Sequence, residues 1–211
     1  MATTISKNLT GGVLGENIDQ SGVNTYAERL AAALPGNRVL IDTQTASTSA
    51  SLDFANAAIG DGTFDNIEVI GHNIVPVTDA QGFEMLVSDD TGATYETTAA
   101  YYGGGSEVDE GAGETLFAVG NGGTSAVLTG SGVSNVAAEG GVNFHMVCMD
   151  MSNASTYFSF HMVGSFVRNT PGMVSFRCGG KYAVANNYDG LQFKFGGNMA
   201  SGTIAVYGIK K

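Results

Sequence analysis

The sequence changes character at residues 64–70, Phe64-Asp-Asn-Ile-Glu-Val-Ile70, where apolar and polar side chains begin to alternate. Such alternation turns one face of a β-strand toward a core and the other toward solvent. The pattern recurs downstream in short runs separated by Gly, Asn or Ser clusters. These runs are Phe83–Ser88, Thr115–Val119, Ala126–Leu128, Val142–Met149, Thr156–Val163, Met173–Arg177, Tyr182–Val184, Leu191–Phe195 and Thr203–Ile209. Their number and spacing predict an all-β fold, an antiparallel β-sandwich or jelly roll, over residues 59–211.

Residues 1–58 differ in composition and are predicted to form an N-terminal arm. Tyr26, Leu30 and Leu34 recur at helical spacing, which predicts one short helix over residues 24–34. Arg38–Ile41 has the pattern of a short strand, and the Ser/Thr/Ala-rich residues 43–51 after it are predicted to be a loop or linker. An arm that docks on a neighbouring subunit fits this composition, and so does a frayed tail.

Three further segments are assigned from composition. Residues 93–102 carry Thr and Tyr in strand-like proportion, whereas the glycine- and acid-rich residues 103–114 predict an exposed acidic loop. Near the C-terminus, residues 196–202, GGNMASG, are predicted to join two strands by a turn in which Asn198, Ser201 and Gly202 favour positive φ angles.

Composition narrows the class of protein. No apolar stretch approaches 18 residues and the N-terminus lacks a secretory signal pattern, so no membrane insertion is expected. Cys148 and Cys178 lie in apolar runs and are predicted to be buried, unbridged thiols, as suits a protein made in a reducing cytoplasm.

The charge is acidic and unevenly distributed. A formal net charge of −11 with only 9 Lys and Arg residues gives no electrostatic support for binding nucleic acid. Residues 1–114 carry a net charge of −14 and residues 115–211 carry +3. This split could orient neighbouring copies in an assembly, or the acidic loops could simply maintain solubility.

Candidate chemistry is sparse, and no catalytic, cofactor-binding or metal-binding residue is predicted. His145 and His161 occupy matching contexts on two strands and would approach one another if those strands pair, either as metal ligands or as ordinary polar positions. Calcium is the other candidate metal, with solvated turns as the alternative. Its candidate carboxylates are Glu107, Asp109, Glu110 and Glu114 in one stretch and Asp89 and Asp90 in another.

An enzymatic function has little support. A carboxylate pair for glycoside hydrolysis could form across the fold, but without Trp its sugar platform would rely on Tyr such as Tyr101 and Tyr102. A GxSxG elbow and a phosphate-binding glycine loop are both absent from the sequence, so we expect a protein that is not an enzyme.

Two segments resemble a known family. Residues 64–79 followed by residues 83–95 resemble a strand-turn-strand unit of tailed-bacteriophage structural proteins, with an aromatic-led strand, a P-x-T-D loop and a strand that ends in a polar-Gly-x-T turn. Residues 193–210 are similar to the closing strand of the same proteins, with the ending N-x-x-x-G-x-I-x-x-Y-G-I. Together these segments cover about 45 residues.

The resemblance implies a non-enzymatic virion structural protein, made in the host bacterial cytoplasm and built into the particle. A tail-fibre, tail-tip or host-recognition module is the first expectation, with a capsid decoration (cement or head-fibre) protein and a carbohydrate-active depolymerase as alternatives. The expected partners are further copies of the chain in a homo-oligomer, other virion proteins and a host surface glycan or receptor. The family is frequently trimeric in fibres, so the resemblance implies a homotrimer.

Overall fold

The computed structural model describes residues 38–210 except for Asp65 and Pro171. This part of the chain is almost entirely β-structure, and every strand pair is antiparallel, which confirms the predicted fold class. The strands are β1 (Arg38–Thr45), β2 (Ser49–Ala55), β3 (Asn66–Pro76), β4 (Phe83–Ser88), β5 (Tyr101–Asp109), β6 (Gly113–Gly123), β7 (Ala126–Val127), β8 (Val142–Met149), β9 (Tyr157–Val167), β10 (Met173–Ala185) and β11 (Gly190–Ile209). Two single turns of helix, α2 (Ala57–Gly60) and a 3-10 turn (Ala137–Glu139), complete the elements, and neither is long enough to cross a membrane. The predicted helix over residues 24–34 lies outside the described residues.

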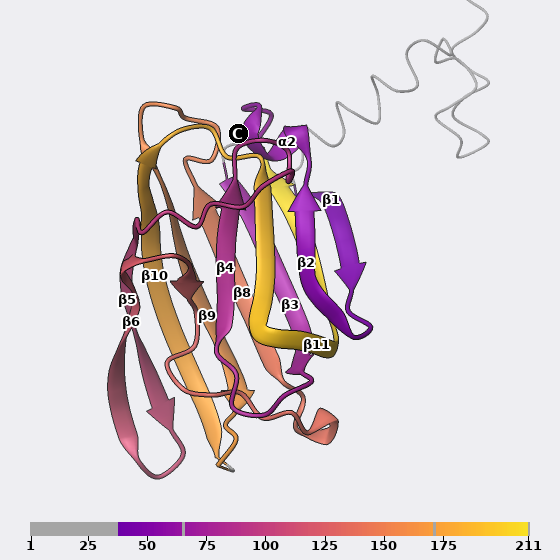
Figure 1. Cartoon of the computed structure of the whole chain (residues 1–211), viewed down its shortest axis with the longest axis vertical. Helices are drawn as coiled ribbons and strands as arrows, with labels where there is room; N and C mark the ends of the chain where they lie inside the picture. Colours follow the sequence, from indigo (N-terminus) through magenta and orange to yellow (C-terminus); the bar gives the residue numbers. More distant parts are fainter. Residues whose placement is uncertain (1–37, 65, 171, 211) are drawn as a thin grey trace, which may run out of the picture. The chain divides into compact units, whose positions relative to one another are not determined.

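The long strand β11 belongs to two layers of the sandwich. Its first part, Gly190–Phe195, pairs with β2 and β4, whereas its second part, Met199–Ile209, pairs with β3 and β1. Figure 1 shows β11 turning a corner between these parts. The large layer therefore has the strand order β6-β5-β10-β9-β8-β3-β11-β1, and the small layer has the order β2-β11-β4-β7.

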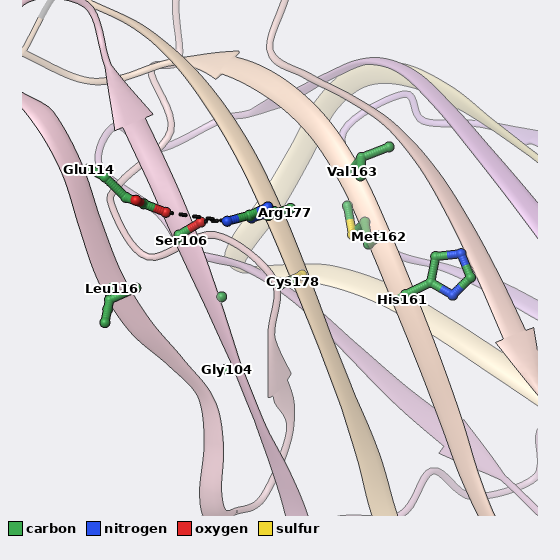
Figure 2. A pocket seen from close by; sticks show the side chains of 10 residues that line it. Gly104, Ser106, Glu114, Leu116, His161, Met162, Val163, Arg177 and Cys178 are labelled. Atoms are coloured by element: carbon green, nitrogen blue, oxygen red, sulfur yellow. Dashed lines mark hydrogen bonds and ion pairs between the residues drawn. The ribbon is translucent and has the colours of Figure 1, made fainter.

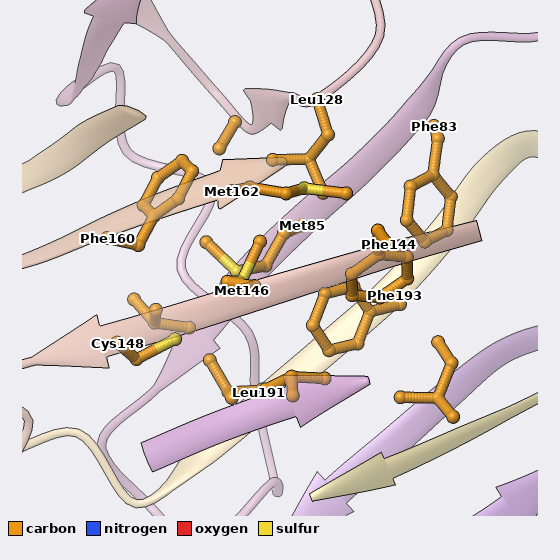
Figure 3. Packing of buried hydrophobic residues seen from close by; sticks show 14 of the residues in the cluster. Phe83, Met85, Leu128, Phe144, Met146, Cys148, Phe160, Met162, Leu191 and Phe193 are labelled. Carbon is orange, nitrogen blue, oxygen red and sulfur yellow. The ribbon is translucent and has the colours of Figure 1, made fainter. Parts of the chain in front are cut away.

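The core lies between the two layers and is rich in Phe and Met. Phe83 on β4 and Phe193 on β11 reach across to Phe144 on β8, with ring centroids 5.5 and 5.8 Å apart. Figure 3 shows Met85, Met146 and Met162 filling the space beside these rings. Unbranched Met side chains fit the irregular gaps between large rings, which explains why a Met-rich sequence closes a dense core here.

The predicted acidic loop over residues 103–114 is wrong, because these residues form most of a β-hairpin between β5 and β6. The glycines have a structural use here. A Cβ at Gly103 would overlap the carbonyl oxygen of Gly179 on the neighbouring strand, so glycine at this position permits the close approach of β5 and β10.

The predicted linker over residues 43–51 is also wrong. Residues 43–45 end β1 and residues 49–51 begin β2, and both strands pair with β11. Leu52 and Phe54 are buried and anchor β2 in the core, while the Ser and Thr residues face outward. The compact unit starts at Arg38, so residues 38–58, which we had assigned to the arm, contribute two strands and a helical turn to the sandwich.

Two boundaries within the strand-rich region need correction. Residues 93–100 form no strand, and β5 begins only at Tyr101. At the C-terminus the predicted pair of strands is one bent strand, and of the three proposed turn residues only Gly202 has a positive φ, at 117°. A side chain at Gly202 would overlap the backbone of Asn73, so glycine at this position permits the close approach of β11 and β3.

Candidate interaction surface

The large layer has one side on the core and one side that the other described elements leave uncovered. On β10, Phe176 and Cys178 are buried, whereas Arg177 between them is exposed. The strand registers place Arg177 opposite Ser106 on β5 and Val163 on β9, and residues directly opposite share a face of the sheet. We call this side of the large layer, from β6 to β1, the outer face.

Exposed apolar side chains gather on the outer face. Ten large apolar side chains of the described residues are well exposed, and the registers place seven of them here. These seven are Leu40, Tyr102, Val108, Leu116, Tyr157, Val163 and Met173. Leu116 on the edge strand β6 is 80% exposed, the highest value of the ten. Single exposed apolar residues are ordinary, but a face that collects them is typical of a surface that binds a partner.

The outer face is nearly neutral on a strongly acidic domain. Residues 38–211 contain 17 acidic and 7 basic residues, a formal net charge of −10. By register, the charged side chains of the outer face are two acids and three bases, with the histidines neutral: Glu68, Glu114, Arg38, Arg177 and Lys181. Most of the acidic charge therefore lies elsewhere on the domain.

Four of the five charges on the outer face form two ion pairs. Arg38 forms an ion pair with Glu68 and stacks over the Tyr207 ring, with the guanidinium carbon 4.1 Å from the ring centroid. Arg177 Nε donates a hydrogen bond to Ser106 Oγ at 3.2 Å, and its Nη2 lies 3.6 Å from Glu114 Oε1. The Arg177–Glu114 pair is well exposed, so it contributes little stability but removes a free charge from the face.

An open groove of about 480 Å³ crosses the outer face at β6, β5, β10 and β9. Figure 2 shows Leu116 and Glu114 on one side of it, Val163 and His161 on the other, and Ser106 and Arg177 between them. Gly104 lines the groove and pairs with Gly179 on β10, so no side chain rises from either position. This pair of glycines leaves the sheet backbone accessible to another molecule.

The histidines lie on the outer face but form no metal site. Strand β8 does pair with β9, with His145 opposite Val163 and His161 opposite Val147, so the two imidazoles are diagonal neighbours. His145 Nε2 lies 2.5 Å from Glu68 Oε1, so a hydrogen bond to that carboxylate engages the ring instead. Within residues 38–210, apart from the two gaps, no three His, Cys, Asp or Glu side chains are close enough to hold a metal ion.

Three of the four acids of the 107–114 stretch have different partners, and the fourth, Glu110, is exposed in the turn of the hairpin. Glu107 is 5% exposed on the core side of β5, where its carboxylate accepts hydrogen bonds from Gly130 N at 2.5 Å and Ser131 N at 3.1 Å. Asp109 forms an ion pair with Arg168, and Glu114 faces Arg177 on the opposite side of the hairpin. The stretch therefore does not converge on a calcium site.

The second pair of candidate calcium ligands shapes a turn. Asp90 accepts hydrogen bonds from Thr94 N at 2.8 Å and Thr94 Oγ1 at 2.7 Å, and these bonds lower the pKa of its carboxyl group. Asp89 Oδ2 accepts a bond from Asn186 Nδ2 at 2.5 Å. Asp90 is thus engaged within the loop that leaves β4, whereas Asp89 binds the segment between β10 and β11.

The two tyrosines proposed as a sugar platform have opposite environments. Tyr101 is buried, its hydroxyl accepts from Val87 N and donates to the Glu96 carbonyl, each at 3.0 Å, and burial raises the pKa of its phenol. Tyr102 is exposed on the outer face. A stacking platform built from both rings is therefore excluded, because they lie on opposite sides of β5.

The prediction for the cysteines is confirmed. Cys148 and Cys178 are both free and buried. Burial raises the pKa of both thiols, that of Cys178 to about 12. Neither thiol is therefore activated as a nucleophile.

The sequence reasoning missed the outer face as a unit and the buried position of Glu107. The outer face is assembled from strands that are distant in sequence. The only pattern in the sequence that indicated it is the presence of large apolar residues at both the inward and the outward positions of the later strands.

No family model, no curated protein and no solved structure matches this chain.

Proposed function

We propose that this chain is a non-enzymatic structural protein of a tailed-bacteriophage particle, a tail-fibre, tail-tip or host-recognition module that works as a homo-oligomer. The observation that supports it best is the outer face, which combines seven exposed large apolar side chains with paired charges on an otherwise acidic domain. A surface of this kind suits a protein whose work is to bind other proteins in an assembly.

The polar residues that a hydrolase would use are engaged in holding the fold. Glu107 accepts hydrogen bonds from the backbone of residues 130–131, and Asp109 forms an ion pair with Arg168. The Tyr101 hydroxyl is hydrogen-bonded to the backbone of Val87 and Glu96. These contacts favour a structural role over the depolymerase alternative.

The resemblance of residues 64–95 and 193–210 to tailed-bacteriophage structural proteins supplies the particle and the expectation of a trimer. In the structure these residues form β3, β4 and most of β11, which hold the two layers together. They are therefore elements of the scaffold. The resemblance supports the proposal that the chain belongs to a virion, and the outer face supports the proposal that the chain binds other proteins there.

The test is to locate the chain in purified particles by a cryo-electron microscopy map and by mass spectrometry of the separated head and tail fractions. We expect the chain in the tail fraction, in symmetric density. Recovery in the head fraction would favour the capsid decoration alternative. Complete absence from infectious particles would overturn the proposed function.

A further inference from the structure

We propose that the outer face is the surface through which one copy of this chain binds a second copy. This inference rests on the proposed function, which requires self-assembly, and it adds the place on the fold where the copies meet.

The size of the outer face matches that of a stable interface. The large layer has eight strands. Eight strands at about 4.8 Å spacing, with about seven residues each at about 3.3 Å, cover on the order of 900 Å². A standard protein–protein interface takes about 800 Å² from each partner. The whole face, and not the groove alone, is therefore of the extent that a second copy would cover.

Charge makes a second copy the best-fitting partner for this face. Two domains with a net charge of −10 each repel one another over most of their surfaces. The outer face avoids this repulsion, because its two acids, Glu68 and Glu114, have Arg38 and Arg177 as partners within the same chain. Since both acids are countered within their own chain, no unpaired carboxylate of one face meets a carboxylate of the other. The remaining charge of the face, Lys181, lies over the Tyr157 ring.

The relief of the face allows close approach. Leu116 and Val163 stand on the two sides of the groove, and the glycines between them expose the backbone of β5 and β10. Apolar side chains of a neighbouring copy can then pack against the sheet.

The decisive experiment is sedimentation of the full chain and of single variants from nanomolar to micromolar concentration. Val163→Lys places a charge at a 52% exposed position in the middle of the face, and Leu116→Ser removes its most exposed apolar side chain without adding a charge. The matched control is Val136→Lys, because Val136 is 48% exposed and directly precedes the 3-10 turn, outside the strands that form the outer face. Circular dichroism melts of all variants check that each one folds.

We expect the wild type and Val136→Lys to form the same oligomer, and Val163→Lys and Leu116→Ser to weaken self-association at least tenfold while keeping the wild-type melting temperature. If both outer-face variants assemble like the wild type, or if the wild type is monomeric at micromolar concentration, the inference is overturned. The inference is also overturned if the outer-face variants keep wild-type self-association but lose binding to a glycan or to another virion protein. A monomeric wild type would also contradict the homo-oligomer in the proposed function, whereas oligomeric outer-face variants would contradict this inference alone. The place of the chain in the particle is tested separately, by the head and tail fractions.

Discussion

The carboxylate of Glu107 is bound to Ser131 by two hydrogen bonds, from the backbone N–H at 3.1 Å and from the hydroxyl at 2.8 Å. Glu107 lies on β5 of the large layer, whereas Ser131 follows β7 of the small layer. The pair therefore connects the two layers at the side of the sandwich opposite the corner of β11. A buried carboxylate with three donors is a structural anchor whose loss leaves those donors unsatisfied.

Replacing the anchor is expected to destabilise the domain. In Glu107→Gln an amide NH₂ replaces one carboxylate oxygen and opposes a donor, so we expect a loss of about 1–3 kcal/mol in the free energy of unfolding. Urea denaturation of Glu107→Gln and of the wild type measures this difference in the free energy of unfolding. Glu110→Gln is the matched control, because Glu110 is exposed in the turn of the same hairpin and should leave the midpoint unchanged. Equal midpoints for Glu107→Gln and the wild type would show that the carboxylate is not an anchor.

The hairpin also shows how far the sequence predicts the fold. Strands with a clear apolar–polar alternation were placed correctly, including Phe83–Ser88 and Val142–Met149. The segment around Glu107 was not, because its glycines and acids have the composition of a loop. Its strand conformation comes from pairing with β10 and β6, which single-sequence patterns do not contain.

A second prediction compares the neighbouring tyrosines of β5. Tyr101→Phe removes the acceptor of the Val87 N–H and the donor to the Glu96 carbonyl in a buried site, so we expect a loss of about 1–3 kcal/mol. Tyr102→Phe alters an exposed ring and should change stability by less than about 0.5 kcal/mol. Thermal melts of the two variants measure the difference. A larger loss for Tyr102→Phe than for Tyr101→Phe would contradict the assignment of these residues to opposite faces.

The candidate surface was less predictable than the fold. Both Leu116 and Val163 were assigned to strands from the sequence, but their common exposure depends on which strands are neighbours. The order β6-β5-β10-β9 brings together residues as far apart in sequence as Ser106 and Arg177, which are separated by 71 positions. The position of Arg177 between Ser106 and Val163 is a consequence of that order. Alternation predicts which residues share a side of one strand, whereas the face itself is a property of the topology.

The buried cysteines give a prediction on reactivity. Because the pKa values of both thiols are raised by burial, with the Glu107 carboxylate as a second cause at Cys178, native protein at pH 8 should not react with a chromogenic disulfide reagent. After unfolding in denaturant without reductant, two thiols per chain should react. Fewer than two would indicate that the cysteines are oxidised in the native protein.

The same thiols predict how stability depends on pH. The pKa values of both thiols in the folded chain lie above the value near 8.5 of an unfolded chain. The contribution of the two protonated thiols to the free energy of unfolding is therefore fully present below about pH 8.5, and it is lost as the pH rises above that value. We expect the free energy of unfolding to fall by about 1.4 kcal/mol per pH unit for each thiol in that range. Urea titrations at pH 7.5, 8.5 and 9.5 measure this slope, and a Cys148→Ala/Cys178→Ala variant should show a smaller one. An equal slope in that variant would assign the pH dependence to other groups.

The adjacent glycines of β5 separate a folding requirement from a requirement for assembly. A Cβ at Gly103 would overlap the Gly179 carbonyl oxygen, so Gly103→Ala should destabilise the domain by about 1–3 kcal/mol through strand displacement. At Gly104 a Cβ would contact only the Phe117 carbonyl oxygen, at 3.7 Å, so Gly104→Ala should keep or slightly raise the stability of the monomer.

Because Gly104 lines the groove of the outer face, its substitution by the larger Val should leave the domain folded and weaken self-association. Melting temperatures and sedimentation of Gly103→Ala, Gly104→Ala and Gly104→Val measure both effects, and wild-type self-association of Gly104→Val would count against close approach of a second copy at this groove.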